Sequence, residues 1–215
     1  MNGEMDNLTL EESVYLRLSE DILSGELSKG HSLTESHLCA KYCASRTPVR
    51  AAIRRLSEEG LVKCIPNRGA VVVGIDKELL CDVYQIRMRL EGLSSSLAAQ
   101  RISKEDLDRL ASTIELSEFY AKKNDTENLR QLDSKFHEII YRASGNKMLE
   151  KTLCELHRFI KSYRKKSLSV ENRLLNSIAE HREILEAIKN HNSAEADELT
   201  STHVRRAFEN LSKIF

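Results

Sequence analysis

A short helix with a basic face most constrains the fold of this 215-residue chain. In the stretch CASRTPVRAAIRRLSEEGL, residues 43–61, Ser45 can cap the helix and Pro48 falls in its first turn, where a missing N–H costs nothing. One apolar stripe recurs at helical spacing: Val49, Ile53 and Leu56. Basic side chains lie largely on the other faces: Arg46, Arg50, Arg54 and Arg55. The pattern suits a helix in the major groove of DNA, although a solvated surface helix can share it.

The sequence around this helix predicts a winged helix-turn-helix domain over residues 1–75. Capping residues and glycines place one helix before Gly25 and a second short helix from Glu35 to about Lys41. After the basic helix, β-prone runs flank the turn sequence Pro66-Asn67-Arg68-Gly69. The predicted order is therefore helix, helix, helix, strand, turn, strand.

Residues 76–215 show only helical patterns, so we expect a mainly α protein whose winged domain is followed by an all-α helical bundle. The expected helices cover residues 77–101, 103–123, 125–144, 147–166, 177–190 and 193–214. The fifth helix would begin at a capping box made by Ser177 and Glu180. The helix expected over residues 77–101 has an apolar stripe: Leu79, Val83, Ile86, Leu90, Leu93 and Leu97. Arg87 lies at its margin, where a long cation either reaches out to water or serves as an anion hook.

Composition excludes several classes of protein. The formal net charge is zero, so contact with nucleic acid must use a local basic patch. No apolar run approaches the length of a membrane span and no signal-peptide core is present, so we expect no membrane partner. The five cysteines form no CxxC motif. We therefore expect reduced thiols in a cytoplasmic protein.

Four polar side chains are predicted to point into the helical bundle: Asp133, His137, His181 and His203. A single inward histidine is usually a hydrogen-bonded core residue, but buried ionisable groups are costly unless they are paired or bind a metal. One carboxylate and three imidazoles could hold Zn²⁺, Ni²⁺ or another divalent ion. A purely structural cluster remains an alternative. The other histidines are expected to be surface or capping residues: His31, His37, His157 and His191.

The stretch LTESHLCAKYCASRTPVRAAIRRLSEEGLVKCIPNRGAVVV resembles the DNA-binding domain of the GntR superfamily of bacterial transcription regulators, over residues 10–74. The resemblance implies that Arg46 and Arg50 contact DNA and that Gly69 lets the wing approach the minor groove. The whole implied DNA-binding set is Glu35, Ser45, Arg46, Thr47, Arg50, Arg68 and Gly69. Arg68 could instead be a solvated turn residue. Ser36 replaces an arginine found in some members, so one base contact is expected to differ.

The stretches LDSKFHEIIYRASGN and AEHREILEAIKNHNSAEADELTSTHV resemble the helical ligand-binding (FCD) domain of the FadR-type branch of these regulators, closest to its shorter six-helix members. The resemblance implies that a divalent metal is held by Asp133, His137, His181 and His203. It also implies a small carboxylate effector, which Arg87 can contact. A homodimer would then bind a palindromic double-stranded operator.

Two other functions are consistent with the same residues. In a metal-dependent enzyme, Glu138 or Glu180 would be the general base, but each adjoins a histidine in sequence and so points about 100° away from it. We therefore expect no enzyme. In a plain metal sensor, the ion itself would be the signal.

Overall fold

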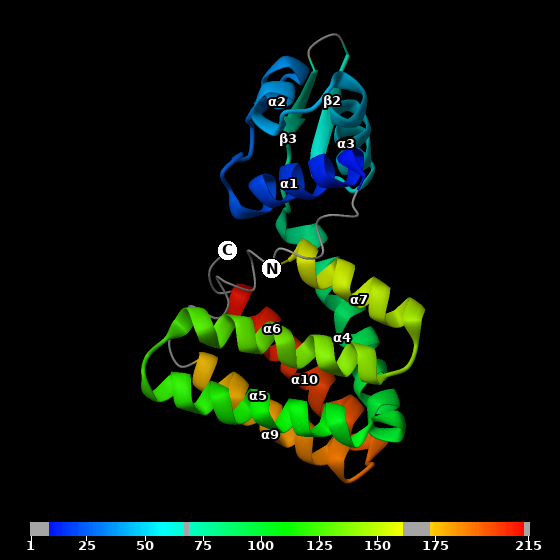
Figure 1. Cartoon of the computed structure of the whole chain (residues 1–215), viewed down its shortest axis with the longest axis vertical. Coiled ribbons are helices and arrows are strands. Elements are labelled where there is room, and N and C mark those ends of the chain that lie inside the picture. Colours follow the sequence, from blue (N-terminus) through cyan, green and yellow to red (C-terminus); the bar gives the residue numbers. More distant parts are fainter. Residues whose placement is uncertain (1–8, 67–68, 161–172, 213–215) are drawn as a thin grey trace. The chain divides into compact units, whose positions relative to one another are not determined.

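The computed structural model describes residues 9–66, 69–160 and 173–212, and the chain divides into two compact units (Figure 1). The first unit is Met1–Leu79 and the second is Leu80–Phe215. Helices dominate both units, and one small sheet lies in the first. This confirms the expected fold class, a winged helix-turn-helix followed by a helical bundle.

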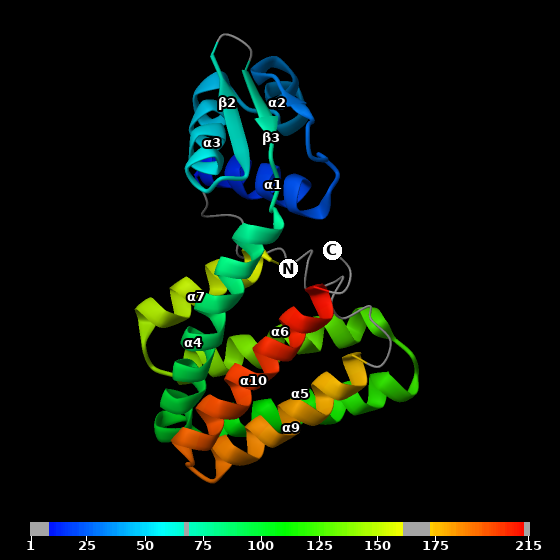
Figure 2. The ribbon, with the colours of Figure 1, turned by 180° about the vertical axis from the view of Figure 1, so that it is seen from behind.

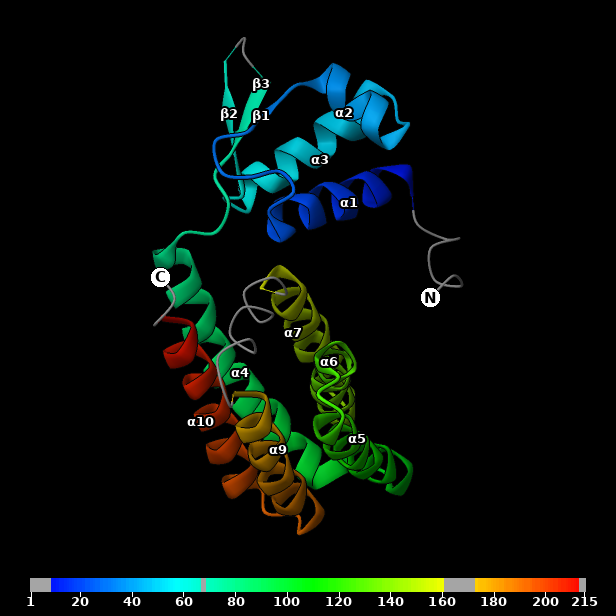
Figure 3. The ribbon, with the colours of Figure 1, turned by 90° about the vertical axis from the view of Figure 1, so that its left-hand side faces the viewer.

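The first unit packs three helices beside a three-stranded antiparallel sheet of order β1-β3-β2, as Figure 3 shows. Its elements are α1 (Leu10–Ser24), β1 (Ser32–Leu33), α2 (Glu35–Tyr42), α3 (Arg46–Glu58), β2 (Val62–Ile65) and β3 (Gly69–Val72). The hairpin register pairs Val62 with Val72. Strand β1 pairs Ser32 with Val71 and was missed from the sequence, since two residues show no alternation.

The apolar stripe of α3 is buried in the core of this unit, as its spacing predicted: Val49, Ile53 and Leu56. Ala52 is buried beside them. Thr9 caps α1 by accepting a hydrogen bond from the backbone N–H of Glu12. Ser45 does occupy the N-cap position of α3, but its side chain makes no cap hydrogen bond, so that expected contact is wrong.

The second unit is built, within its described residues, from helices that lie side by side (Figure 2). They are α4 (Lys77–Arg101), α5 (Lys104–Lys122), α6 (Thr126–Ala143), α7 (Lys147–Phe159), α9 (Arg173–Lys189) and α10 (Ser193–Ser212). Helix α5 packs against α6 and α9, and α10 packs against α9. Five of these helices start at side chains that accept a bond from a backbone N–H of the first turn: Asp76, Ser103, Asp125, Asn146 and Asn192.

The buried face of α4 differs from the expected stripe. Ile86 and Leu93 are 49% and 43% exposed, whereas Arg87 lies at the centre of the buried face. That face is Leu80, Val83, Tyr84, Arg87, Glu91, Ser94, Ser95 and Ala98. Apolar periodicity failed here because the inward positions hold an ion pair and small serines, whose polar atoms find partners inside the bundle.

Two expected helix limits also change. Helix α9 already includes Arg173, so Ser177 is not an N-cap. The Ser177 hydroxyl instead donates to Asp133 Oδ1 on α6, at 3.3 Å. The helix expected over residues 147–166 is α7 as far as Phe159, and residues 161–166 lie outside the described ranges.

Two expectations from composition can be compared with the structure. All five cysteines are free thiols. Within the described ranges, every helix is too short or too polar to cross a membrane.

Gly69 has a structural role in the first unit. It adopts φ +84°, and a Cβ added there would meet the backbone oxygen of Leu33 at 2.7 Å. Gly60 also has a positive φ, +77°, but a Cβ there would meet nothing within 4 Å. Comparing an alanine substitution at each of the two glycines therefore distinguishes the effect of backbone strain from the effect of a clash with β1.

We predict that Gly69→Ala destabilises the sheet more than Gly60→Ala. Both variants carry the left-handed strain, about 1–2 kcal/mol, and only the first also pushes β1 away. Hydrogen exchange of the full chain, followed in peptides that cover β1 and β3, should be faster in Gly69→Ala than in Gly60→Ala. Equal exchange in the two variants would show that the backbone at Leu33 shifts to accommodate the added Cβ without destabilising the sheet.

Candidate functional site

The N-terminal end of α3 presents the residues expected to read DNA. Ser45, Arg46, Thr47 and Arg50 are all exposed. Arg50 donates from Nε to Glu35 Oε1 on α2 at 2.7 Å, and this hydrogen bond lowers the pKa of Glu35. A carboxylate on one helix therefore orients a guanidinium on the next, and other donors of Arg50 stay available. Arg68 lies outside the described residues.

The basic run of α3 has two roles. Arg55 turns back towards α1, donating to Glu12 at 2.7 Å and lying 3.6 Å from the Tyr15 ring centroid. This side chain joins helices of the first unit. Arg46, Arg50 and Arg54 are exposed, so the exposed positive charge of the helix is concentrated on these three.

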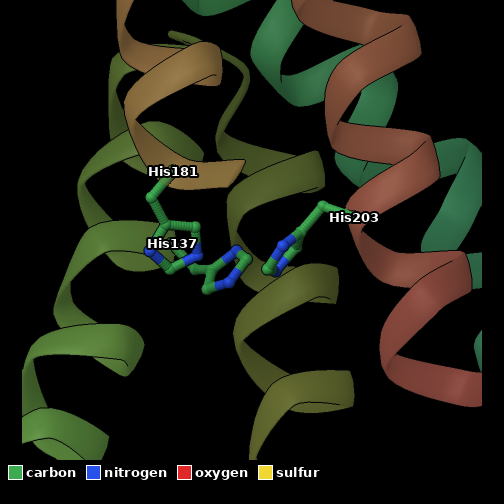
Figure 4. A group of neighbouring side chains, drawn as sticks. All are labelled: His137, His181 and His203. Carbon is green, nitrogen blue, oxygen red and sulfur yellow. The ribbon is translucent and has the colours of Figure 1, made fainter. Parts of the chain in front are cut away.

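Three histidines from three helices converge inside the second unit, and Figure 4 shows their rings gathered together. They are His137 on α6, His181 on α9 and His203 on α10. A ligand atom of each lies within 4.8 Å of the others, and all three side chains are buried. Sequence spacing predicted that these residues point inward, and the helix packing brings them together.

Asp133 lies beside this cluster rather than among the three converging imidazoles. Its Oδ1 is 3.7 Å from His181 Nε2, and it also accepts the hydrogen bond from Ser177. Phe136 stacks on the His181 ring with the centroids 3.9 Å apart, and this contact helps to hold the imidazole in place. The Asp133 carboxylate is thus a close neighbour of His181.

Two buried glutamates lie against Nδ1 of two of the histidines. Glu91 Oε2 on α4 is 3.1 Å from His137 Nδ1, and Glu180 on α9 accepts from His203 Nδ1 at 2.6 Å. Because an ionised carboxylate only accepts, Nδ1 of His203 must carry the proton, and the carboxylate beside His137 favours the same tautomer there. Each Nε2 then keeps its lone pair. Among the described residues, the buried Nε2 of His137 has no hydrogen-bond partner.

The charges around Glu180 and His203 fix their protonation. Burial raises the pKa of Glu180, but the bond from His203 and the Arg173 guanidinium outweigh it and lower that pKa to about 2. Burial lowers the pKa of His203 to about 4, despite its bond to Glu180. At neutral pH the pair is therefore a carboxylate and a neutral imidazole.

Arg87 does not reach water, as a snorkelling side chain would. It is 2% exposed, and its Nε and Nη2 lie 2.7 and 2.6 Å from Glu91 Oε1. Burial lowers the pKa of Arg87, but Glu91 and nearby tyrosines outweigh it and raise the pKa. The guanidinium stays charged next to the histidine cluster, with Glu91 between them.

Sequence reasoning missed three parts of this centre. Glu91 escaped notice, although its i+4 spacing from Arg87 on one face of α4 was a usable signal. Glu180 was judged only against its neighbour His181, whereas its partner His203 comes from another helix. His157 is not a surface residue: it is buried, and its ring nitrogens lie 3.4 Å from Tyr141 Oη and Ser134 Oγ.

The donor set fits a first-row divalent ion. Neutral imidazole nitrogens are preferred ligands of such ions, and histidine ligands usually donate their second N–H to a carboxylate or carbonyl. His203 already has that arrangement, and His137 has a carboxylate oxygen 3.1 Å from its Nδ1. The residues present could therefore hold a metal through His137, His181 and His203, with Asp133 as the adjacent oxygen donor.

A helix-turn-helix with a strand wing, joined to a helical unit, is the architecture of a DNA-binding transcription regulator. Residues 10–72 match the family described as bacterial regulatory proteins, gntR family, and residues 82–206 match the FCD domain. The chain belongs to the GntR family of transcription regulators, in the group that carries an FCD domain. This confirms the family resemblance and the expectation that the protein is a regulator rather than an enzyme.

Individual relatives agree with this assignment. The chain is 28% identical over 202 residues to the uncharacterised HTH-type transcriptional regulator YdhC of Bacillus subtilis, covering 93% of this chain and 90% of that protein. It is 28% identical over 141 residues to the gluconate operon transcriptional repressor of the same organism, covering 64% and 56%. The structure of Escherichia coli McbR/YncC has the same fold, with a TM-score of 0.76, 22% identity and coverage of 96% and 99%.

The buried pair at α9 and α10 predicts a loss of stability in acid. An unfolded chain protonates His203 near 6.5, whereas the folded chain does so near 4, so the unfolded state binds more protons between these values. Without added metal, stability should fall as the pH is lowered from 6.5 to 4, by at most about 1.4 kcal/mol per pH unit from this site. Glu180 adds a second loss below its unfolded value of 4.5.

Urea denaturation at several pH values tests this prediction. His203→Gln keeps an N–H donor for Glu180 but removes the titration, so its stability should depend less on pH between 6.5 and 4. His31→Gln, at an exposed position of the first unit, should retain the wild-type slope. If the dependence of stability on pH between 6.5 and 4 is unchanged in His203→Gln, the loss of stability in acid does not come from protonation of His203.

Proposed function

We propose that this protein is a cytoplasmic, dimeric regulator that binds a palindromic operator and changes its affinity when a small carboxylate binds near a metal ion. The observation that carries the proposal is the charge arrangement of the two units. One exposes arginines at the start of α3, and the other buries Arg87 beside three converging histidines. Arg87 is paired with Glu91, but among the described residues its buried Nη1 has no hydrogen-bond partner, which is a reason to expect an anionic ligand.

The DNA-binding proposal rests on α3. Two guanidinium groups one helical turn apart can read guanine edges or hold phosphates in a major groove. Arg46, Thr47 and Arg50 would face the DNA, and Glu35 would orient Arg50. Ser45, Arg68 and Gly69 complete the proposed set from the family pattern.

The dimer proposal follows from the symmetry of palindromic operators, because two copies are needed to read two half-sites. The exposed face of α4 supports it. Ile86 and Leu93, seven residues apart on one helix, are both more than 40% exposed. We propose that a second copy covers such an apolar face.

The effector proposal rests on the second unit. His137, His181, His203 and Asp133 would hold the ion, Zn²⁺ or Ni²⁺ being the leading candidates, and Arg87 would attract the carboxylate. The bound ion would add positive charge near Arg87 and so help to hold the acid. The relative named for a gluconate operon supports a sugar acid as the first class to test. A plain metal sensor is the alternative, in which operator affinity follows the ion without any acid.

We predict that Arg46→Ala and Arg50→Ala each weaken binding to a cognate duplex by about ten-fold or more, because each removes a guanidinium from the groove. The duplex is first selected from a random pool by the wild-type chain, and affinity is then measured by fluorescence anisotropy. Arg109→Ala, which removes one half-exposed positive charge from the second unit, is the control and should bind normally. If selection yields no sequence with two-fold symmetry, the operator proposal fails.

We predict that Zn²⁺ raises the melting temperature of the metal-depleted protein, by the equivalent of about 2.7 kcal/mol at 100 times its dissociation constant. His137→Ala and His181→Ala should lose this stabilisation, whereas His191→Asn, an exposed histidine on the same unit, should keep it. Anisotropy with the selected duplex, with Zn²⁺ alone and with Zn²⁺ plus D-gluconate, then separates the two regulatory schemes. A response to Zn²⁺ alone favours the metal sensor.

A further inference from the structure

Glu91 lies between Arg87 and His137, one of the three histidines of the cluster. One of its carboxylate oxygens contacts Arg87, at 2.6–2.7 Å, and the other lies 3.1 Å from His137 Nδ1. The side chain is 0% exposed. We infer that Glu91 couples the two sites, so that a carboxylate bound at Arg87 tightens metal binding at His137. This inference rests on the proposed metal and effector sites.

The coupling follows from how one carboxylate divides its charge. A carboxylate that accepts from Nδ1 of a ligating histidine fixes the tautomer and makes Nε2 more basic. In Glu91 this effect is reduced, because Arg87 withdraws negative charge through its opposite oxygen. Anything that weakens the hold of Arg87 on Glu91 therefore strengthens His137 as a metal ligand.

Arg87 can take a second anion without leaving Glu91. Among the described residues, the buried Nη1 of Arg87 has no hydrogen-bond partner, whereas Nε and Nη2 face Glu91. An anion at Nη1 would share the guanidinium charge with Glu91. More of the Glu91 charge would then act on the imidazole, and reciprocity requires that metal binding also tightens the anion.

Glu180 provides a matched comparison. It also accepts from a histidine of the cluster, but its guanidinium partners are Arg173 at 2.8 Å and Arg206 at 3.2 Å. Replacing Glu180 should weaken metal binding while leaving the path between Arg87 and His137 in place. Replacing Glu91 should remove both.

The variant Glu91→Gln is informative because an amide cannot accept on both sides. Whichever way its side chain faces, one of the two donors, Arg87 or His137 Nδ1–H, meets an N–H group. If the amide nitrogen faces His137, the proton must move to Nε2, which blocks the ligand. If the amide nitrogen faces Arg87, the hydrogen bonds between residue 91 and Arg87 are lost.

The experiment measures Co²⁺ affinity from its visible absorption, in 50 mM sodium acetate and in sodium chloride of equal ionic strength. Acetate is the probe because it is the smallest carboxylate. In wild type we expect acetate to tighten Co²⁺ binding about five-fold or more. In Glu91→Gln, Co²⁺ binding should be about ten-fold weaker or more, with no acetate effect. In Glu180→Gln, Co²⁺ binding should be weaker but the acetate effect should remain.

Three results would overturn the inference. They are no acetate effect in wild type, an acetate effect that persists in Glu91→Gln, and an effect that disappears equally in Glu180→Gln. The second would mean that acetate binds the ion directly. By contrast, if wild type binds no Co²⁺ at all, the proposed metal site itself fails, which is a different outcome.

A measurement on the wild-type protein covers the case in which Glu91→Gln does not fold, as circular dichroism would reveal. Nitrogen NMR of the metal-free protein distinguishes the tautomers of its imidazoles. We expect His137 and His203 to carry their protons on Nδ1. A proton on Nε2 of His137 would contradict the role assigned to Glu91.

Discussion

The second unit depends on how it pairs the charges that it buries. Arg87 and Glu91 are 2% and 0% exposed, and Arg173 is 2% exposed beside Glu180. An isolated charge at such positions would cost several kcal/mol, so each pair must be kept within hydrogen-bond distance. Each glutamate also holds a histidine from a neighbouring helix. The same contacts that make burial tolerable therefore fix α4 against α6 and α9 against α10.

Much of the fold follows from local patterns in the sequence. The basic helix, its apolar stripe and the wing hairpin each depend on residues a few positions apart, so spacing and turn chemistry were sufficient to predict them. The inward direction of His137, His181 and His203 also follows from helical periodicity. Their convergence does not, because it depends on how three separate helices pack; for that step the family resemblance supplied the expectation.

The errors share a physical cause. The stripe chosen on α4 assumed that an inward face is apolar, whereas Arg87 and Glu91 neutralise each other there and Ser94 and Ser95 hydrogen-bond or pack inside the bundle. Ser177 has the sequence of a cap but uses its hydroxyl on another helix. For Ser94, Ser95 and Ser177 the partner is distant in the sequence, and no local pattern can reveal it. The Arg87–Glu91 pair is different, because its two members are four residues apart on one helix and their spacing could have indicated it.

Helix α4 is the element in which these constraints meet. The chain leaves β3 at Val72 and enters α4 at Lys77, so this helix is the covalent continuation of the winged unit. It also carries Arg87 and Glu91, and through Glu91 it contacts the histidine cluster. Under the proposed function, a ligand that redistributes charge between the Arg87 guanidinium and the His137 imidazole would act on contacts that hold α4 in its bundle. The response would then begin on the helix that is joined directly to the DNA-binding domain.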